Sequence, residues 1–344
     1  MEGVSMTNKV KIYTFAHNRP DLLPIQYDTF KKYIKDDFEF IVFNNEKPGS
    51  HGGYNPLRKE EIFKVCEYLG IECIDVRLDD EFRIINNEVQ YTHDGAYVNG
   101  STACSYPCTW IWKNYICKDQ GLSIIIDTDM FLCKEVSFIE MMEGYNFAYV
   151  PSYRDNSTLK YTWNNLIFVK PQEIPNPEEM SWGYGYINGT AVDVGGEVYY
   201  YLQKYEDQLK TLYIDQWGLL VDSSAPYELS LNGCAQYWAD FEKLELASGE
   251  SQALLPPNPK TFPHQMDRED YWDYFYKNWV KLLEIVEGHG FPKPTFIDFI
   301  KLEKDDSIED SFIFHYKAAS NYMPWADEKY NQEKTTAFRK LLGI

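Results

Sequence analysis

An apolar run followed at once by two aspartates most restricts how this chain can fold. Residues 122–126 read Leu-Ser-Ile-Ile-Ile, a pattern typical of a buried strand, and Gly121 precedes them. Asp127 and Asp129 stand at the carboxyl end of that strand. Open α/β sheets bind their ligands in the crevice at the carboxyl ends of the strands. The pattern therefore predicts a sheet with two carboxylates at its ligand-binding edge.

Two carboxylates in this position are suited to a metal ion. Mg²⁺ and Mn²⁺ prefer oxygen ligands, and a diphosphate can serve as a co-ligand. The plain alternative is an acidic turn that merely ends the strand. Met130 and Phe131 continue the apolar pattern, however, and fit an ordinary polar turn poorly. We therefore expect Asp127 and Asp129 to bind a divalent ion together with a diphosphate.

The residues before this strand alternate between strand and helix patterns. Apolar runs at 10–16, 38–43 and 71–78 predict three strands, and helical spacing of apolar residues predicts a helix in each gap. Because crossovers between such strands are right-handed, the β-α-β-α-β order places all three in one parallel sheet. A third helix, around 108–116 and closed by Gly121, leads into the aspartate strand. No GxGxxG follows the first strand and no GxxxxGK[ST] occurs, which speaks against dehydrogenases and P-loop enzymes.

The pattern changes after Val136. Strands are expected at 147–150, 166–169, 186–194 and 311–315, and helices at about 195–209, 272–286 and 327–342. Asp215 and Gln216 are expected in a loop that follows the first of these helices.

Charge and cysteine content restrict the partners and the compartment. The chain has 33 Lys and Arg against 53 Asp and Glu, a net charge of −20, which repels nucleic acids and anionic membranes. No apolar run approaches the roughly 20 residues that span a bilayer, and the first residues lack the apolar core of a signal peptide. The seven cysteines show no CxxC spacing, which suggests free thiols in a reducing compartment. We expect a cytoplasmic protein without nucleic-acid partners or a transmembrane segment.

Three downstream segments, together with this layout, resemble the GT-A glycosyltransferases. Asp193-Val-Gly195, before a predicted helix, resembles the Asn-x-Gly segment of the glycogenin-like retaining enzymes, with Asp in place of Asn. Asp215-Gln216 resembles the Asp-Gln pair that those enzymes place beside the donor sugar. Residues 312–325 resemble their His-x-x-Gly-x-x-Lys-Pro-Trp segment, with longer spacing and without Gly or Lys at the expected places.

The resemblance implies an α/β GT-A fold, with a central, mostly parallel sheet flanked by helices and a helical C-terminal extension. Residues 1–135 would form the nucleotide-sugar-binding half and 136–255 the acceptor half of one domain. Residues 256–344 would return to the metal site. The implied activity is metal-dependent transfer of a sugar from a nucleotide diphosphate sugar, a UDP-sugar in the first instance, to a hydroxyl acceptor. The order of the motifs favours retention of the anomeric configuration.

The resemblance also implies roles for particular residues. The metal ligands would be Asp127, Asp129 and His315, and an imidazole ligand favours Mn²⁺ over Mg²⁺. Lys317 would contact the phosphate oxygens. Further nucleotide contacts are expected from residues at the ends of the first two strands: Thr14, Phe15, Ala16, Arg19 and Asn44. The catalytic candidates are Asp193, Asp215, which would orient the sugar hydroxyls, and Gln216, which would act on the reacting sugar.

Each of these residues has a structural alternative. His315 could be an ordinary core histidine and Lys317 a solvated surface charge. Asp193 and the Asp215-Gln216 pair could cap helices, and Asn44 could simply form the turn after its strand. Two other functions also stay open: a nucleotidyltransferase of related fold, or a carbohydrate-binding protein without turnover. The first would normally carry an N-terminal Gly-rich loop that bears Arg or Lys, and the segment 14–22 of this chain has only Arg19.

Overall fold

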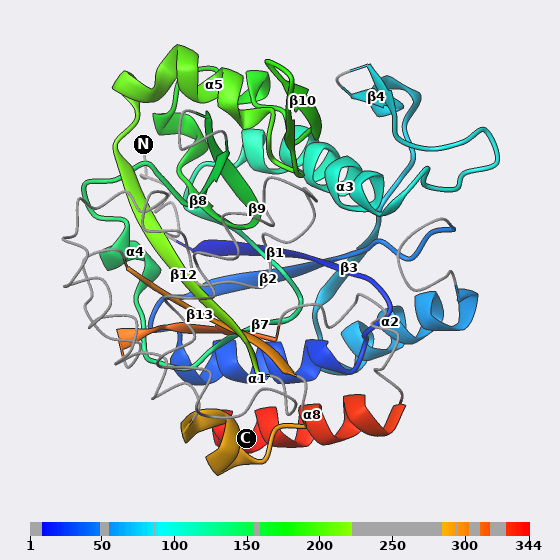
Figure 1. Cartoon of the computed structure of the whole chain (residues 1–344), viewed down its shortest axis with the longest axis vertical. Helices are drawn as coiled ribbons and strands as arrows, with labels where there is room; N and C mark the ends of the chain where they lie inside the picture. Colours follow the sequence, from blue (N-terminus) through cyan, green and yellow to red (C-terminus); the bar gives the residue numbers. More distant parts are fainter. Residues whose placement is uncertain are drawn as a thin grey trace, which may run out of the picture.

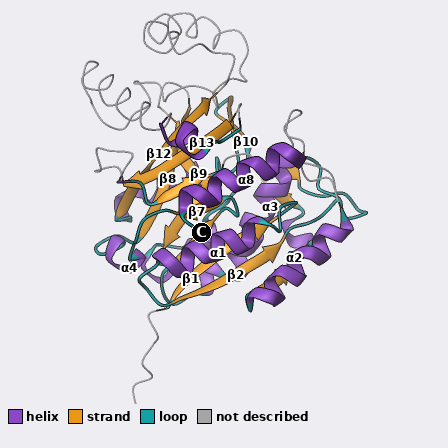
Figure 2. Ribbon diagram, turned by 90° about the horizontal axis from the view of Figure 1, so that it is seen from below, coloured by secondary structure: helices purple, strands orange, loops and turns teal. Residues whose placement is uncertain are grey.

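A mixed sheet of ten strands, formed within the described residues, runs through the centre of the molecule (Figure 1). The computed structural model describes residues 9–48, 55–85, 87–154, 159–221, 284–292, 295–302, 310–316 and 328–344. The strand order is β3-β2-β1-β6-β9-β8-β12-β13-β14-β7. Helices cover both faces of this sheet, as the view in Figure 2 also shows. The predicted α/β class is therefore confirmed.

The N-terminal half is built from alternating strands and helices. Its elements are β1 (Val10–Ala16), α1 (Leu22–Tyr33), β2 (Phe38–Asn44), α2 (Pro56–Leu69) and β3 (Glu72–Asp75). Both strand pairs, β1 with β2 and β2 with β3, are parallel, as predicted. Helix α2 starts at a proline after a capping asparagine, Asn55, and ends at Gly70, whose φ of 67° suits glycine. Local sequence signals therefore set the limits of this helix.

The chain then crosses to the other side of β1. The connecting elements are η1 (Asp80–Phe82), β4 (Ile84–Ile85), β5 (Glu88–Val89), α3 (Gly100–Asn114) and η2 (Ile116–Lys118). Strand β6 (Ser123–Ile126) pairs with β1 in parallel, and β7 (Met130–Leu132) follows it. The predicted third helix is present but ends at Asn114, well before Gly121. Because successive strands lie on opposite sides of β1, the boundary between β1 and β6 is the topological switch point of the sheet.

The second half extends the sheet with strands of both directions. It contains α4 (Phe138–Met141), β8 (Phe147–Arg154), β9 (Leu159–Val169), η3 (Pro171–Glu173), η4 (Pro177–Glu179), β10 (Gly185–Ile187), β11 (Thr190–Val192), α5 (Val198–Tyr205), η5 (Glu206–Gln208) and β12 (Thr211–Val221). Strand β9 is antiparallel to both β6 and β8, whereas β12 is parallel to β8. A parallel α/β half, a strand that ends in the two aspartates and a mixed second half are the layout expected of a GT-A-like fold.

The C-terminal residues return to the same sheet. Strand β13 (Thr295–Leu302) pairs with β12, and β14 (Ile313–His315) lies between β13 and β7. The last helix, α8 (Glu328–Leu342), lies beside α1 (Figure 1). The predicted last strand and closing helix are confirmed. The long helix expected at 272–286 falls mostly outside the described residues, of which 284–289 are helical.

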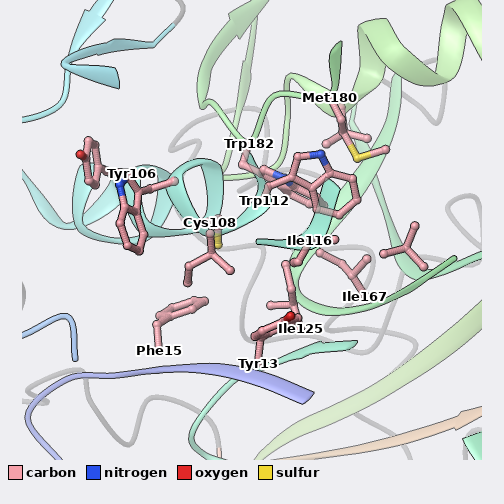
Figure 3. Close-up of a cluster of buried hydrophobic side chains, with 14 of the residues drawn as sticks. Tyr13, Phe15, Tyr106, Cys108, Trp112, Ile116, Ile125, Ile167, Met180 and Trp182 are labelled. Carbon is pink, nitrogen blue, oxygen red and sulfur yellow. The ribbon is translucent and has the colours of Figure 1, made fainter. Parts of the chain in front are cut away.

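Two apolar cores lie on opposite faces of the sheet. One packs α3 and α5 against strand residues such as Tyr13 and Phe15 (Figure 3). The other packs α1 and α2 against strand residues such as Ile12 and Ala16. Successive residues of β1 therefore alternate between the two cores, as strand geometry requires. Within the described part of the chain, no helix combines the length and the apolar character needed to cross a membrane.

The prediction of a single strand at 186–194 is wrong. The structure has a hairpin there, in which β10 and β11 pair in antiparallel fashion. Asn188 and Gly189 connect the strands with φ angles of 52° and 86°. Asn-Gly is the favoured sequence for such a two-residue turn, because both positions require positive φ. The hairpin places Asp193 immediately after its second strand.

Replacing Gly195 by alanine is expected to destabilise the fold more than the same change at Gly189. Both glycines have positive φ, 88° and 86°, so alanine costs about 1–2 kcal/mol at either position. Only at Gly195 would the added Cβ lie 2.3 Å from the backbone oxygen of Thr162 in β9; no described atom lies within 4 Å at Gly189. The overlap should add about 1–3 kcal/mol. Urea unfolding midpoints measure the difference, and equal losses would contradict this close packing.

Candidate functional site

The turn between β6 and β7 is fixed by hydrogen bonds from other elements. The buried Gln26 of α1 donates through Nε2 to the backbone oxygens of Asp127 at 2.6 Å and of Met130 at 3.0 Å. Thr128 donates through Oγ1 to the backbone oxygen of Phe15, at 3.0 Å. The turn is thereby attached to both α1 and the end of β1. The two aspartates consequently lie at the switch point of the sheet.

The electrostatics of this turn favour a bound cation. Asp129 is 8% exposed, and Oδ1 of Asp127 is buried without a hydrogen-bond partner among the described residues. Burial, and then the neighbouring charge of Asp129, raise the pKa of Asp127 well above its usual value. A buried carboxylate without a partner is unfavourable unless an opposite charge offsets it. A divalent ion would supply that charge.

His315 lies beside the aspartates, as predicted. Strand β14 pairs with β7 so that His315 is opposite Met130. Its Nε2 is 3.4 Å from Oδ1 of Asp129, and the side chain is 3% exposed. The imidazole ring also packs against Trp163 of β9, with 5.4 Å between ring centroids. The histidine is thus both a core residue and a neighbour of the carboxylate pair.

The donor atoms present fit a divalent ion that takes some of its ligands from a substrate. Among the described residues, no group of three His, Cys, Asp or Glu side chains is arranged to hold a metal on its own. Mg²⁺ is commonly bound by one or two carboxylates together with substrate phosphates, so a protein site of this kind need not be complete. The buried, unpartnered Oδ1 of Asp127 is the observation that favours such an ion here.

The end of β1 reaches the same edge of the sheet. Thr14 and Ala16 are fully buried and Phe15 is 8% exposed. Oγ1 of Thr14 has no hydrogen-bond partner within the described part of the chain. These three residues lie in the strand next to β6, close in the fold to the aspartate turn. Their predicted contact with a nucleotide stays a prediction.

A buried His–Glu pair follows β1, and sequence reasoning did not find it. Nδ1 of His17 is 2.9 Å from Glu46, a fully buried carboxylate that also accepts the N–H groups of Asn18 and Asn55. Burial alone would raise the pKa of Glu46, but the bonds from His17 and these N–H groups hold it below its usual value. Asn18 has a φ of 60°, typical of a tight turn. The sequence signals were the His-Asn step after a strand and a glutamate directly after the next strand.

Arg19 connects the β1 loop to the C-terminal part of the chain. It donates to both carboxylate oxygens of Asp21, at 2.8 and 2.7 Å, and to Oγ1 of Thr335 in α8 at 3.3 Å. Its guanidinium carbon also lies 5.6 Å from the ring centroid of Tyr316. The predicted nucleotide residue is therefore close to the residue that follows His315.

The side chain of Asn44 forms hydrogen bonds to backbone groups. Its Nδ2 donates to the backbone oxygen of Lys59 at 2.9 Å, and its Oδ1 accepts from the N–H of Glu46 at 3.2 Å. The oxygen of this fully buried amide thus holds the turn after β2, the structural alternative given above, and its nitrogen holds α2. Lys317, the predicted phosphate contact, lies outside the described residues.

Asp193 directly follows strand β11. Its side chain is exposed, and Oδ1 accepts the N–H of Val194 at 2.8 Å. Burial raises the pKa of the Cys104 thiol on α3 to about 12, with further contributions from Asp127, Asp193 and Asp129.

The expectation that Asp215 and Gln216 lie in a loop is wrong, because both belong to β12. Asp215 is opposite Lys301, with 3.4 Å between Oδ2 and Nζ, and Gln216 is opposite Ile300. Successive strand residues point to opposite faces, so the pair cannot act from one face.

Register identifies the residue that shares a face with His315. Gln216 is opposite Ile300, which is in turn opposite Ile313 of β14. His315 is two residues beyond Ile313, on the same face of the sheet. Gln216 therefore shares the face of His315, whereas Asp215 shares the opposite face with Lys301.

Replacing Asp127 by asparagine is expected to stabilise the metal-free protein at pH 7, because burial and the charge of Asp129 raise the pKa of the Asp127 carboxyl. Because the folded-state pKa is raised, the folded protein binds the extra proton, and stability falls as pH rises from the ordinary value of 3.8. Below about pH 4 the carboxyl is protonated in both states and the gain should vanish. Urea midpoints in EDTA at pH 7 and pH 4 test this, with the exposed Asp37→Asn as control. A gain of the same size at both pH values would contradict the assignment.

No protein-family model matches the sequence, and no curated protein matches it. Among solved structures, the chain is similar to the X-ray structure of the mannosyltransferase Ktr4p from S. cerevisiae, with a TM-score of 0.35 and 10% sequence identity. The similarity covers 50% of this chain and 59% of that chain, less than two thirds of its length.

Proposed function

We propose that this protein is a glycosyltransferase that moves a sugar from a nucleotide diphosphate sugar to a hydroxyl acceptor. The observation that carries the proposal is the pair of carboxylates at the switch point of the sheet, in which Asp129 and the Oδ1 atom of Asp127 are buried. Ligands of open α/β sheets bind at this point. A divalent ion there would offset the negative charge that Asp127 and Asp129 bring together, and a diphosphate would supply further oxygen ligands to that ion.

The residues around the turn suit departure of a nucleotide diphosphate. A divalent ion bound by Asp127, Asp129 and His315 would act as a Lewis acid on the diphosphate. Its imidazole ligand favours Mn²⁺. Asp129 and His315, 3.4 Å apart, would hold the diphosphate end of the donor at the edge of the sheet. Thr14, Phe15 and Ala16 would contact the nucleoside, with UDP as the first nucleotide to test.

We further propose that the reaction retains the anomeric configuration. Gln216 shares the face of His315, so its amide is the better candidate to act on the reacting sugar. Asp193, whose exposed side chain directly follows β11, would contact the sugar hydroxyls. Asp215, which is paired with Lys301, would act from the opposite face. Asp193 and Gln216 are therefore the preferred pair for the sugar.

Replacing Asp129 by alanine is expected to abolish Mn²⁺-dependent donor binding without unfolding the protein. A screen of nucleotide sugars for nucleotide release, with and without Mn²⁺, first identifies the donor for the wild type. Calorimetry then measures donor affinity for Asp129→Ala and for Asp37→Ala, an exposed control. Retained Mn²⁺-dependent affinity in a variant with a normal circular-dichroism spectrum would contradict the assignment.

Pyrophosphate release from a nucleoside triphosphate, or sugar binding without nucleotide or metal dependence, would favour one of the rival functions.

Replacing Gln216 by alanine is expected to lower kcat by about 10-fold or more with little change in donor affinity. The reason is that its amide would act on the reacting sugar and not on the nucleotide. Gln208→Ala, at an exposed glutamine shortly before β12, is the control. Proton NMR of the fresh product then determines the stereochemistry: an anomeric configuration opposite to that of the donor would show inversion.

A further inference from the structure

Three contacts connect helix α8 to Asp129. Nζ of Lys334 donates to the backbone oxygen of Tyr316, at 3.2 Å. The N–H of Tyr316 donates to the backbone oxygen of Asp129, at 2.8 Å. His315, directly before Tyr316, has its Nε2 3.4 Å from the carboxylate of Asp129. The short segment 315–316 therefore lies between Lys334 and the aspartate turn.

Tyr316 is also held through its ring. Nζ of Lys334 lies 3.9 Å from the ring centroid, and the guanidinium carbon of Arg19 lies 5.6 Å from it. Tyr316 is 1% exposed and Lys334 is 3% exposed. The attraction between a cation and an aromatic face is stronger when both groups are removed from water. Backbone and ring contacts together fix the position of Tyr316.

The attachment of α8 does not need a lysine at this position. The helix buries Ala337, Phe338 and Leu342 in an apolar cluster with residues of β7 and β14. The ring of Phe338 lies 5.1 Å from that of Phe131 and 4.8 Å from that of Phe314, measured between centroids. A buried ammonium group has an unfavourable desolvation term that an apolar side chain lacks. What Lys334 adds is a directed hydrogen bond to one peptide oxygen.

We propose that Lys334 is a positioning residue, which acts through Tyr316 to set the relative placement of His315 and Asp129. Residues that orient metal ligands typically change metal affinity by 10–100-fold when they are lost. The metal-binding part of the inference rests on the proposed function. The part that concerns the placement of His315 is independent of that function, because it involves only contacts within the chain.

The test compares three variants in the full-length protein. Lys334→Met removes Nζ and keeps an unbranched side chain, Lys334→Arg keeps a cation and a donor, and Lys329→Met changes an 81% exposed lysine of the same helix. We expect Lys334→Met to shift the imidazole NMR signals of His315 in metal-free protein and to weaken Mn²⁺ binding, measured by calorimetry, by about 10-fold or more. Lys334→Arg should restore most of both properties, and Lys329→Met should change neither. Urea midpoints verify that each variant is folded.

Unchanged His315 signals in folded Lys334→Met would overturn the proposal, because they would show that the lysine only helps to attach the helix. If the wild type binds no Mn²⁺, the proposed function fails, and the His315 signals alone then decide whether Lys334 positions the histidine. If Lys334→Met does not fold, Lys334→Gln takes its place. Glutamine keeps an N–H donor but loses the charge, and the same signals and affinities are compared with those of Lys334→Arg.

Discussion

The parallel pairing of β6 with β1 is the interaction on which the rest of the site depends. It places Ile124 opposite Ile12 and brings the aspartate turn beside the end of β1. Since β2 and β3 lie on one side of β1, the next strand of the sheet, β6, has to be added on the other side. The reversal opens the crevice in which such sheets bind ligands. The aspartates, the His17–Glu46 pair and the β1 residues all lie at this one edge.

A second strand pairing brings residues that are far apart in the sequence into the same site. Strand β14 lies against β7 and brings His315 to a turn that ends nearly 190 residues earlier. The same strand joins β13 and β12 to the sheet, so Gln216 lies on the face of the histidine. The carboxylates and the imidazole consequently come from opposite ends of the chain. A change in the packing of the C-terminal helix can therefore affect the turn that contains Asp127 and Asp129.

The parts of the fold that sequence could predict are those with local causes. The β-α-β-α-β unit follows from the period of its apolar residues, and the limits of α2 follow from Asn55, Pro56 and Gly70. The placement of Asp215 could not be predicted in this way, because β12 is a strand through its pairing with β13, some 86 residues later. The hairpin at Asn188-Gly189 did have a local signal, which a search for alternation alone overlooked. His17 and Glu46 follow different strands, and only the register of β1 and β2 brings them together.

The hydrogen bonds of Gln26 have a consequence for how the protein folds. Its amide nitrogen contacts backbone oxygens 101 and 104 residues away, on either side of the aspartate turn. Neither carbonyl can receive these bonds until α1 has docked on the sheet, and contacts this far apart in sequence close slowly. We therefore expect the turn to acquire its final shape only once α1 has docked. A nascent chain that already contains both aspartates still lacks the completed site until that docking is finished.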